Sequence, residues 1–167
     1  MTRLTLLLFL LSITLTRAQS IEELDSKGGF KDFKIGDSLN VHQDKIKFMK
    51  TLDNADTKLY LVKERVSVKS YTGEIELEFY KGRVQEVIVS FKTSSPADYD
   101  DLLRSLETLY GPSEKAKPKS GEVARFEKLF TWSGKKVNLR IGYDENYKLT
   151  EMVFSGAHDI EKLKSDF

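Results

Sequence analysis

The feature that most constrains the fold is a run in which acidic and apolar residues alternate strictly. Residues 74–79 read Glu-Ile-Glu-Leu-Glu-Phe, so an extended chain would place every carboxylate on one side and every apolar side chain on the other. The turn candidate Lys81-Gly82 follows, and residues 84–91 return with Val87, Val89 and Phe91 on one side. Two alternating runs joined by a glycine turn predict a β-hairpin with one solvated face.

The same alternation recurs over much of the chain after residue 57. Further strands are expected at residues 58–64, 66–71, 123–132, 136–143 and 149–155. Ser133-Gly134 and residues 144–146 consist of small and polar residues that favour turns. The last three strands should therefore form a meander.

One segment carries a helical pattern instead. Ser95 can cap a helix, Pro96 suits its first position, and Gly111-Pro112 can end it. Apolar residues between them recur every three or four positions and form one stripe: Tyr99, Leu102, Leu103, Leu106, Leu109 and Tyr110. Such a stripe needs an apolar partner, and the sheet face is the available one.

Two other helices are expected. Residues 39–50 would place Leu39, Ile46 and Met49 inward, and residues 157–167 would form a short helix at the end of the chain. The predicted fold class is therefore α+β: an antiparallel β-sheet, built of hairpins and a meander, with helices packed on one face.

The N-terminus has the composition of an export signal. Arg3 precedes an uncharged, mostly apolar run over residues 4–15, and Ala18 offers a small residue for cleavage. This run is shorter than the roughly 20 residues that span a bilayer. We expect a signal peptide at residues 1–18, a polar and flexible leader at residues 19–29, and a single α+β domain at residues 30–167.

The cysteine content of the chain indicates the cellular compartment in which the protein works. The chain contains no cysteine and no Asn-x-Ser/Thr sequon, whereas small domains secreted by eukaryotes are often rich in disulfides. The absence of cysteine also excludes thiolate metal sites and a lipid anchored through cysteine. We therefore expect a bacterial protein that is exported, either periplasmic or secreted.

Charge excludes two classes of partner. Removing residues 1–18 takes away Arg3 and Arg17, which leaves 25 basic and 26 acidic residues, a net charge of −1. Nucleic-acid binding needs a basic face, and docking on anionic membranes needs clustered lysine and arginine. We expect no nucleic acid and no membrane span after signal removal; the expected partner is another envelope or extracellular protein.

Gly36-Asp37-Ser38-Leu39 resembles the signature of the GDSL esterase and lipase family, in which the serine is a nucleophile activated by a histidine. That family also carries an aspartate three residues before its histidine, whereas Ser155 stands at that place before His158. The other interpretation is a turn in which Asp37 or Ser38 caps the next helix. Ser38 is thus a candidate nucleophile for a serine esterase, and the turn is the favoured interpretation.

Aromatic residues are the candidates for binding. Phe126, Phe130 and Trp132 have even spacing along one expected strand, and several tyrosines stand near expected hairpin ends. Such side chains either fill the core or anchor a protein interface. The predicted binding residues are Trp132, Phe130, Tyr143 and Tyr80. No metal site or cofactor is predicted, because His42 and His158 lack paired ligand spacing.

The Gly36-Asp37-Ser38 entry, the hairpin strands, the helix end at residues 106–112 and the tryptophan-containing meander together resemble BamE-like and β-lactamase-inhibitor-like domains. The resemblance implies a small exported bacterial domain that binds proteins without catalysis. We therefore expect a non-catalytic protein-binding module. The alternatives are a small-ligand carrier, which requires a concave apolar pocket between helix and sheet, and an esterase that uses Ser38.

Overall fold

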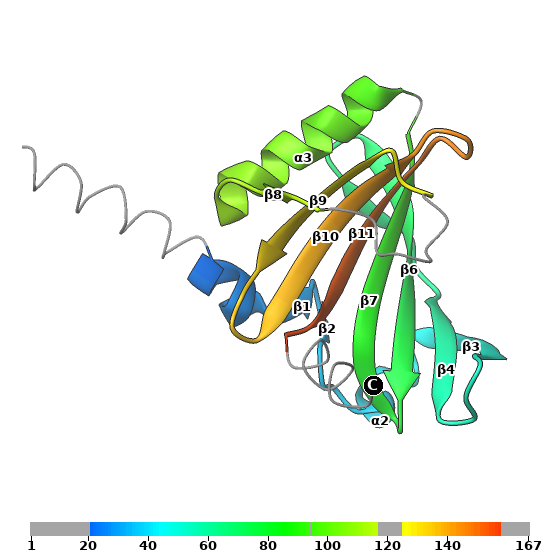
Figure 1. Cartoon of the computed structure of the whole chain (residues 1–167). Helices are drawn as coiled ribbons and strands as arrows, with labels where there is room; N and C mark the ends of the chain where they lie inside the picture. The colour runs from blue at the N-terminus through cyan, green and yellow to red at the C-terminus, as the bar shows by residue number, and fades with distance from the viewer. Residues whose placement is uncertain (1–20, 94, 117–124, 158–167) are drawn as a thin grey trace, which may run out of the picture.

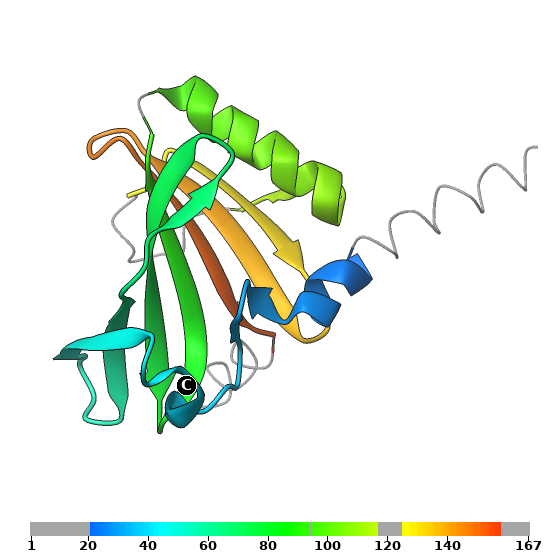
Figure 2. The same ribbon diagram turned by 180° about the vertical axis from the view of Figure 1, so that it is seen from behind.

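A large antiparallel sheet dominates the computed structural model of this protein (Figure 1), which describes residues 21–93, 95–116 and 125–157. Within those residues the sheet has nine strands in the order β3-β4-β6-β7-β11-β10-β9-β8, and β5 pairs with β6. The strands are β3 (Ile46–Thr51), β4 (Thr57–Val62), β5 (Val66–Val68), β6 (Tyr71–Tyr80), β7 (Arg83–Lys92), β8 (Glu114–Lys115), β9 (Lys128–Ser133), β10 (Val137–Asp144) and β11 (Leu149–Gly156). A separate small hairpin joins β1 (Gly29–Phe30) to β2 (Phe33–Lys34), and β1 contacts β11 (Figure 2).

The β6–β7 hairpin confirms the strongest sequence pattern. Its strands pair from Gly73 opposite Phe91 to Tyr80 opposite Arg83. Lys81 and Gly82 make the turn with φ angles of 49° and 77°, in the left-handed region that two-residue hairpin turns require. One side of the hairpin is buried and supplies the centre of the core; its residues, each at most 2% exposed, are Ile75, Leu77, Phe79, Val84, Val87, Val89 and Phe91.

The meander of β9, β10 and β11 is also present, with every neighbour antiparallel. Strand β11 pairs with β7 along seven residues, which joins the meander to the central hairpin in one sheet. The core face of this part carries Leu139, Ile141, Met152 and Phe154, none more than 2% exposed.

Helix α3 (Pro96–Tyr110) lies across the core face of the meander (Figure 1). The hydroxyl of Ser95 and the carboxylate of Asp98 form a capping box, and Gly111 ends the helix with its N–H bonded to the carbonyl oxygen of Glu107. The predicted bounds of this helix are confirmed. Its buried side chains are Tyr99, Leu102, Leu106 and Tyr110.

The α+β prediction, with several helices packed on one sheet face, is wrong. The fold is mainly β, and in the described residues α3 is the one helix longer than two turns. The expected helix at residues 39–50 is reduced to α2 (Leu39–His42), and residues 46–51 pair with β4 instead. Pairing with β4 satisfies the backbone of this segment, and it leaves Met49 46% exposed rather than inward.

The expected loose leader is also structured where it is described. Residues 21–27 are helical, and Leu24 is completely buried. The carboxylate of Asp25 accepts hydrogen bonds from the backbone N–H groups of Lys135, Lys136 and Val137 at 2.8, 2.8 and 3.0 Å. These bonds fix the segment to the β9–β10 turn. The predicted signal peptide and nearly all of the expected C-terminal helix lie outside the described residues.

Candidate functional site

The aromatic residues predicted to bind a partner lie mainly in the interior. Trp132 is 2% exposed, and its Nε1 donates a hydrogen bond to the carbonyl oxygen of Gly111 at 2.7 Å. Tyr143 is 1% exposed, and Phe130 is half-buried. The register of β9 and β10 places all three on the face beneath α3. They therefore help to pack α3 on the sheet and offer little surface to a partner.

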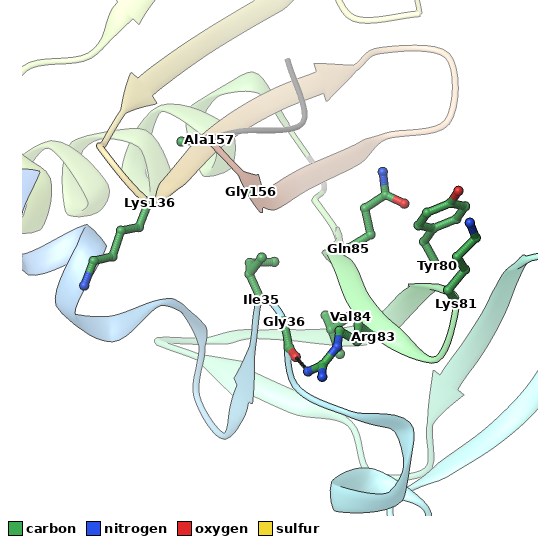
Figure 3. Close-up of a pocket in the computed structure, with 10 residues that line it drawn as sticks. All are labelled: Ile35, Gly36, Tyr80, Lys81, Arg83, Val84, Gln85, Lys136, Gly156 and Ala157. Carbon is green, nitrogen blue, oxygen red and sulfur yellow. Dashed lines mark hydrogen bonds between the residues drawn. The ribbon is translucent and has the colours of Figure 1, made fainter. Parts of the chain in front are cut away.

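Tyr80 is the exposed member of the predicted set and lines an open hollow of about 410 Å³ (Figure 3). The ammonium group of Lys81 lies 5.1 Å from the centroid of the Tyr80 ring. Arg83 Nη1 donates a hydrogen bond to the carbonyl oxygen of Gly36 at 3.0 Å. Figure 3 shows Lys136 at the opposite side of the hollow, with its side chain directed away from Tyr80. The charges around this hollow do not converge on one point.

Ser38 stands at the N-cap position of α2, but its side chain makes no capping hydrogen bond. The neighbouring Asp37 carboxylate contacts His42 Nε2 at 2.9 Å and accepts the backbone N–H of Lys34 at 3.2 Å. His42 is 1% exposed, and its Nδ1 has no hydrogen-bond partner. The histidine therefore does not activate Ser38 here, and His158 lies outside the described residues.

A cavity of about 530 Å³ lies between α3, the β1–β2 hairpin and β11. From α3 its wall contains Leu102, Leu106, Leu109 and Tyr110. From the sheet come Met152 and Phe154, and from the N-terminal hairpin comes Phe30, whose ring lies 5.7 Å from that of Phe154. The cavity is mainly apolar and within the size range of small-molecule sites.

The polar groups of this cavity are mainly lysines on its N-terminal wall. Lys27, Lys31 and Lys34 line it, and no described lining residue is acidic. Lys27 forms an ion pair with Glu23 at 3.0 Å and lies 5.4 Å from the centroid of Tyr110. Ser105 adds a hydroxyl, which donates to the carbonyl oxygen of Asp101 at 2.7 Å. The site therefore combines an apolar body with one basic side.

The opposite face of the sheet has a different character. Glu74, Glu76 and Glu78 project from β6, and Glu78 stands directly opposite Glu86 of β7. Partial burial raises the pKa of Glu78, and the Glu86 carboxylate raises it further. Burial and the carboxylate of Glu151 likewise raise the pKa of Glu76. In the described part of the chain, no three His, Cys, Asp or Glu residues are placed to hold a metal ion.

The sequence leads us to expect a pocket between helix and sheet only as the requirement of the carrier alternative. Local patterns do not identify its lining, because the walls come from segments that are distant in the chain: the stripe of α3 predicts core packing, and the lysines lie in or beside the expected leader. One signal was present: three lysines flank Phe30 within eight residues. Among the described helices none is long and apolar enough to cross a membrane.

No protein-family profile matches this chain, and no curated protein sequence matches it. Among solved structures, a cysteine-rich secretory protein from Staphylococcus aureus subsp. aureus Mu50 is similar, with a TM-score of 0.41 and 12% sequence identity. The match covers 75% of this chain and 44% of that protein. This chain thus spans less than half of that structure, and a likeness of this degree carries no functional argument.

Proposed function

We propose that the protein is an exported, non-catalytic carrier that binds a small, largely apolar ligand in the cavity under α3. The observation that carries this proposal is the concave apolar space of about 530 Å³ between helix and sheet. Binding of an apolar ligand in this concave space is favourable by about 25 cal/mol for each Å² of apolar area that is removed from water. The catalytic alternative has no such support, because His42 Nε2 is bonded to Asp37 and its Nδ1 has no hydrogen-bond partner, so neither ring nitrogen is bonded to Ser38.

The cavity has a rigid frame, as a binding site requires. Its sheet wall belongs to β11, which is paired along its length with β7 and β10. Its helical wall is held by the Trp132–Gly111 hydrogen bond at 2.7 Å. The N-terminal wall is tied down by Leu24 and Asp25. A ligand would therefore meet a preformed site.

The test is to fill the cavity from one side. Ser105 lines it and is partly buried, so the substitution Ser105→Phe places a ring in the space that a ligand would occupy. Thr108→Phe is the matched control, since Thr108 is exposed on the same helix. Each hydroxyl donates to the carbonyl four residues earlier, at 2.7 Å for Ser105 and 2.9 Å for Thr108.

The assay is displacement of an apolar fluorescent probe, with native mass spectrometry of the purified protein to detect ligand that co-purifies. We expect saturable 1:1 binding in the unmodified protein and in Thr108→Phe, and at least a tenfold loss in Ser105→Phe. Failure of the unmodified protein to bind the probe or any apolar competitor would refute the carrier proposal. Equal affinities in the two variants would place the ligand elsewhere.

A second candidate function is the protein-binding module, and edge strand β3 is the observation that favours it. Phe48 and Met49 are 51% and 46% exposed on this strand, which among the described residues pairs with β4 alone. An exposed edge can accept a strand from a partner protein. If so, Phe48→Ser should abolish capture of one specific envelope or extracellular partner, while Ser105→Phe should leave it intact.

A further inference from the structure

We infer that the ligand of the α3 cavity is a single-chain amphiphile with an anionic head group. Its chain would lie between α3 and β11, and its head would lie at Lys31 and Lys34. This inference rests on the proposed carrier function and adds the chemical class of the ligand. It follows from the separation of apolar and charged groups around one cavity.

The apolar part of the cavity is suited to a hydrocarbon chain. Leu102, Leu106, Met152 and Phe154 are each at most 9% exposed and belong to the core around the space. Leu109, which also lines the cavity, is 48% exposed and marks its open side. Since none of these side chains offers a strong hydrogen-bonding group, selectivity within the cavity should follow chain length rather than polar pattern.

The charges lie on one wall. Lys27 is engaged by Glu23 at 3.0 Å. The charge of Lys31 acts on the neighbouring Asp32 carboxylate, but that carboxylate is paired with Lys45 at 3.0 Å, and among the described residues neither Lys31 nor Lys34 forms an ion pair. Two acidic side chains of α3 have other partners. Asp101 forms an ion pair with Lys69 at 2.8 Å, and Glu107 accepts a hydrogen bond from the hydroxyl of Ser113 at 2.7 Å. Two lysine charges at the cavity are therefore left to attract an anion.

This arrangement discriminates between head groups of different charge. A carboxylate, sulfate or phosphate at the mouth gains charge-assisted contacts with two ammonium groups. A trimethylammonium head on the same chain meets repulsion from them, and an uncharged head gains neither effect. Since both lysines are exposed, each contact should change the affinity by no more than about fivefold, and salt should weaken the preference.

The experiment uses three probes with one chain length: decanoate, decan-1-ol and decyltrimethylammonium, each below its critical micelle concentration. Binding is measured by isothermal titration calorimetry on the full mature chain. We expect decanoate to bind and decyltrimethylammonium to bind at least tenfold more weakly. Among octanoate, decanoate and dodecanoate, each added methylene should raise the affinity about fourfold.

Lysine variants locate the head group. The double variant Lys31→Gln/Lys34→Gln should weaken decanoate about three- to tenfold and leave decan-1-ol unchanged. Lys47→Gln/Lys58→Gln is the matched control, because it removes two exposed lysines that do not line the cavity. This control should bind all three probes as the unmodified protein does.

The outcomes separate this inference from the carrier proposal. If decan-1-ol binds and neither lysine variant changes decanoate, the carrier proposal stands and the anionic head group is refuted. If none of the three probes binds, the carrier proposal itself fails. Binding to vesicles of anionic lipid without binding of monomeric decanoate would also overturn the inference, because it would make the lysines a membrane contact.

Discussion

Asp25 is predicted to be one of the most important surface carboxylates for stability, although the sequence around it is polar and near the start of the domain. Its two carboxylate oxygens accept three backbone N–H groups of the β9–β10 turn, more than 100 residues away, at 2.8, 2.8 and 3.0 Å. The perturbation is Asp25→Ala, with Asp25→Asn as a milder form. The same contacts hold the wall that carries Lys27 and Phe30 over the cavity.

The loss of stability follows from the strength of these hydrogen bonds. A hydrogen bond to a charged group contributes about 1.5–3 kcal/mol when well shielded, but Asp25 is only partly buried, so water competes for each donor. We expect Asp25→Ala to lower the free energy of unfolding by about 2–3 kcal/mol in total. Asp25→Asn keeps one acceptor oxygen and should cost about half as much. An exposed carboxylate in a loose leader would instead change stability by less than about 0.5 kcal/mol.

The pH dependence gives a second test of the same contacts. Burial alone would raise the pKa of Asp25, but hydrogen bonds from three backbone N–H groups outweigh it and leave the pKa below its ordinary value of 3.8. A lowered pKa in the folded state stabilises the fold above pH 3.8, and this contribution is lost as pH falls through the lowered pKa. The stability difference between the unmodified protein and Asp25→Asn should therefore shrink below about pH 4.

The assay is urea unfolding followed by Trp132 fluorescence at pH 7 and at pH 3. Glu22→Ala is the control, because Glu22 is exposed on the same helical segment. Gly134→Ala should also lower the free energy of unfolding, because a Cβ there would collide with Asp25 Oδ1 and would lie 2.6 Å from the carbonyl oxygen of Val137. If Asp25→Ala unfolds at the same urea concentration as Glu22→Ala, the reasoning is refuted.

Three other substitutions have defined outcomes. Trp132→Phe removes the hydrogen bond to Gly111 and leaves a void, so chemical unfolding should show a loss of about 1–3 kcal/mol. Glu78→Gln should stabilise the fold by a few tenths to about 1 kcal/mol at pH 7, because the pKa of Glu78 is raised by burial and by Glu86. That gain should disappear below about pH 4, where both states are protonated, and a loss of stability at pH 7 would contradict it. Ser38→Ala should change neither the melting temperature by more than about 2 °C nor any esterase activity of the preparation; a selective loss of ester cleavage would reinstate Ser38 as a nucleophile.

The elements predicted correctly are those in which the local sequence pattern favours the same conformation as the packing in the folded protein. In the β6–β7 hairpin, residue types alternate along both strands and Gly82 stands in the turn. The side predicted to be apolar is buried, and the opposite side is more exposed. In α3 the apolar stripe coincides with a capping box at Ser95 and a glycine at the end. In both cases the local signal and the final packing require the same conformation, so the prediction needed no knowledge of distant contacts.

The failures have a common cause in long-range pairing. Residues 46–51 have helical spacing of their apolar side chains, yet pairing with β4 makes them an edge strand. The segment around Asp25 is polar, yet it is ordered by backbone groups at residues 135–137. Trp132 and Tyr143 have the composition of an interface, yet α3 covers them. None of these contacts is encoded by neighbouring residues, and so no local pattern reveals them.

The candidate site depends on the same long-range contacts, because its apolar wall joins α3 to β11 and its basic wall comes from the N-terminal hairpin. The most direct test is to titrate ¹⁵N-labelled protein with decanoate and follow backbone amide shifts by NMR. We predict saturable changes confined to residues 27–34, to α3 from Leu102 to Tyr110, and to the residues around Val68, Met152 and Phe154. Saturable changes centred instead on the hollow beside Tyr80 and Arg83, or no saturable change at all, would contradict it.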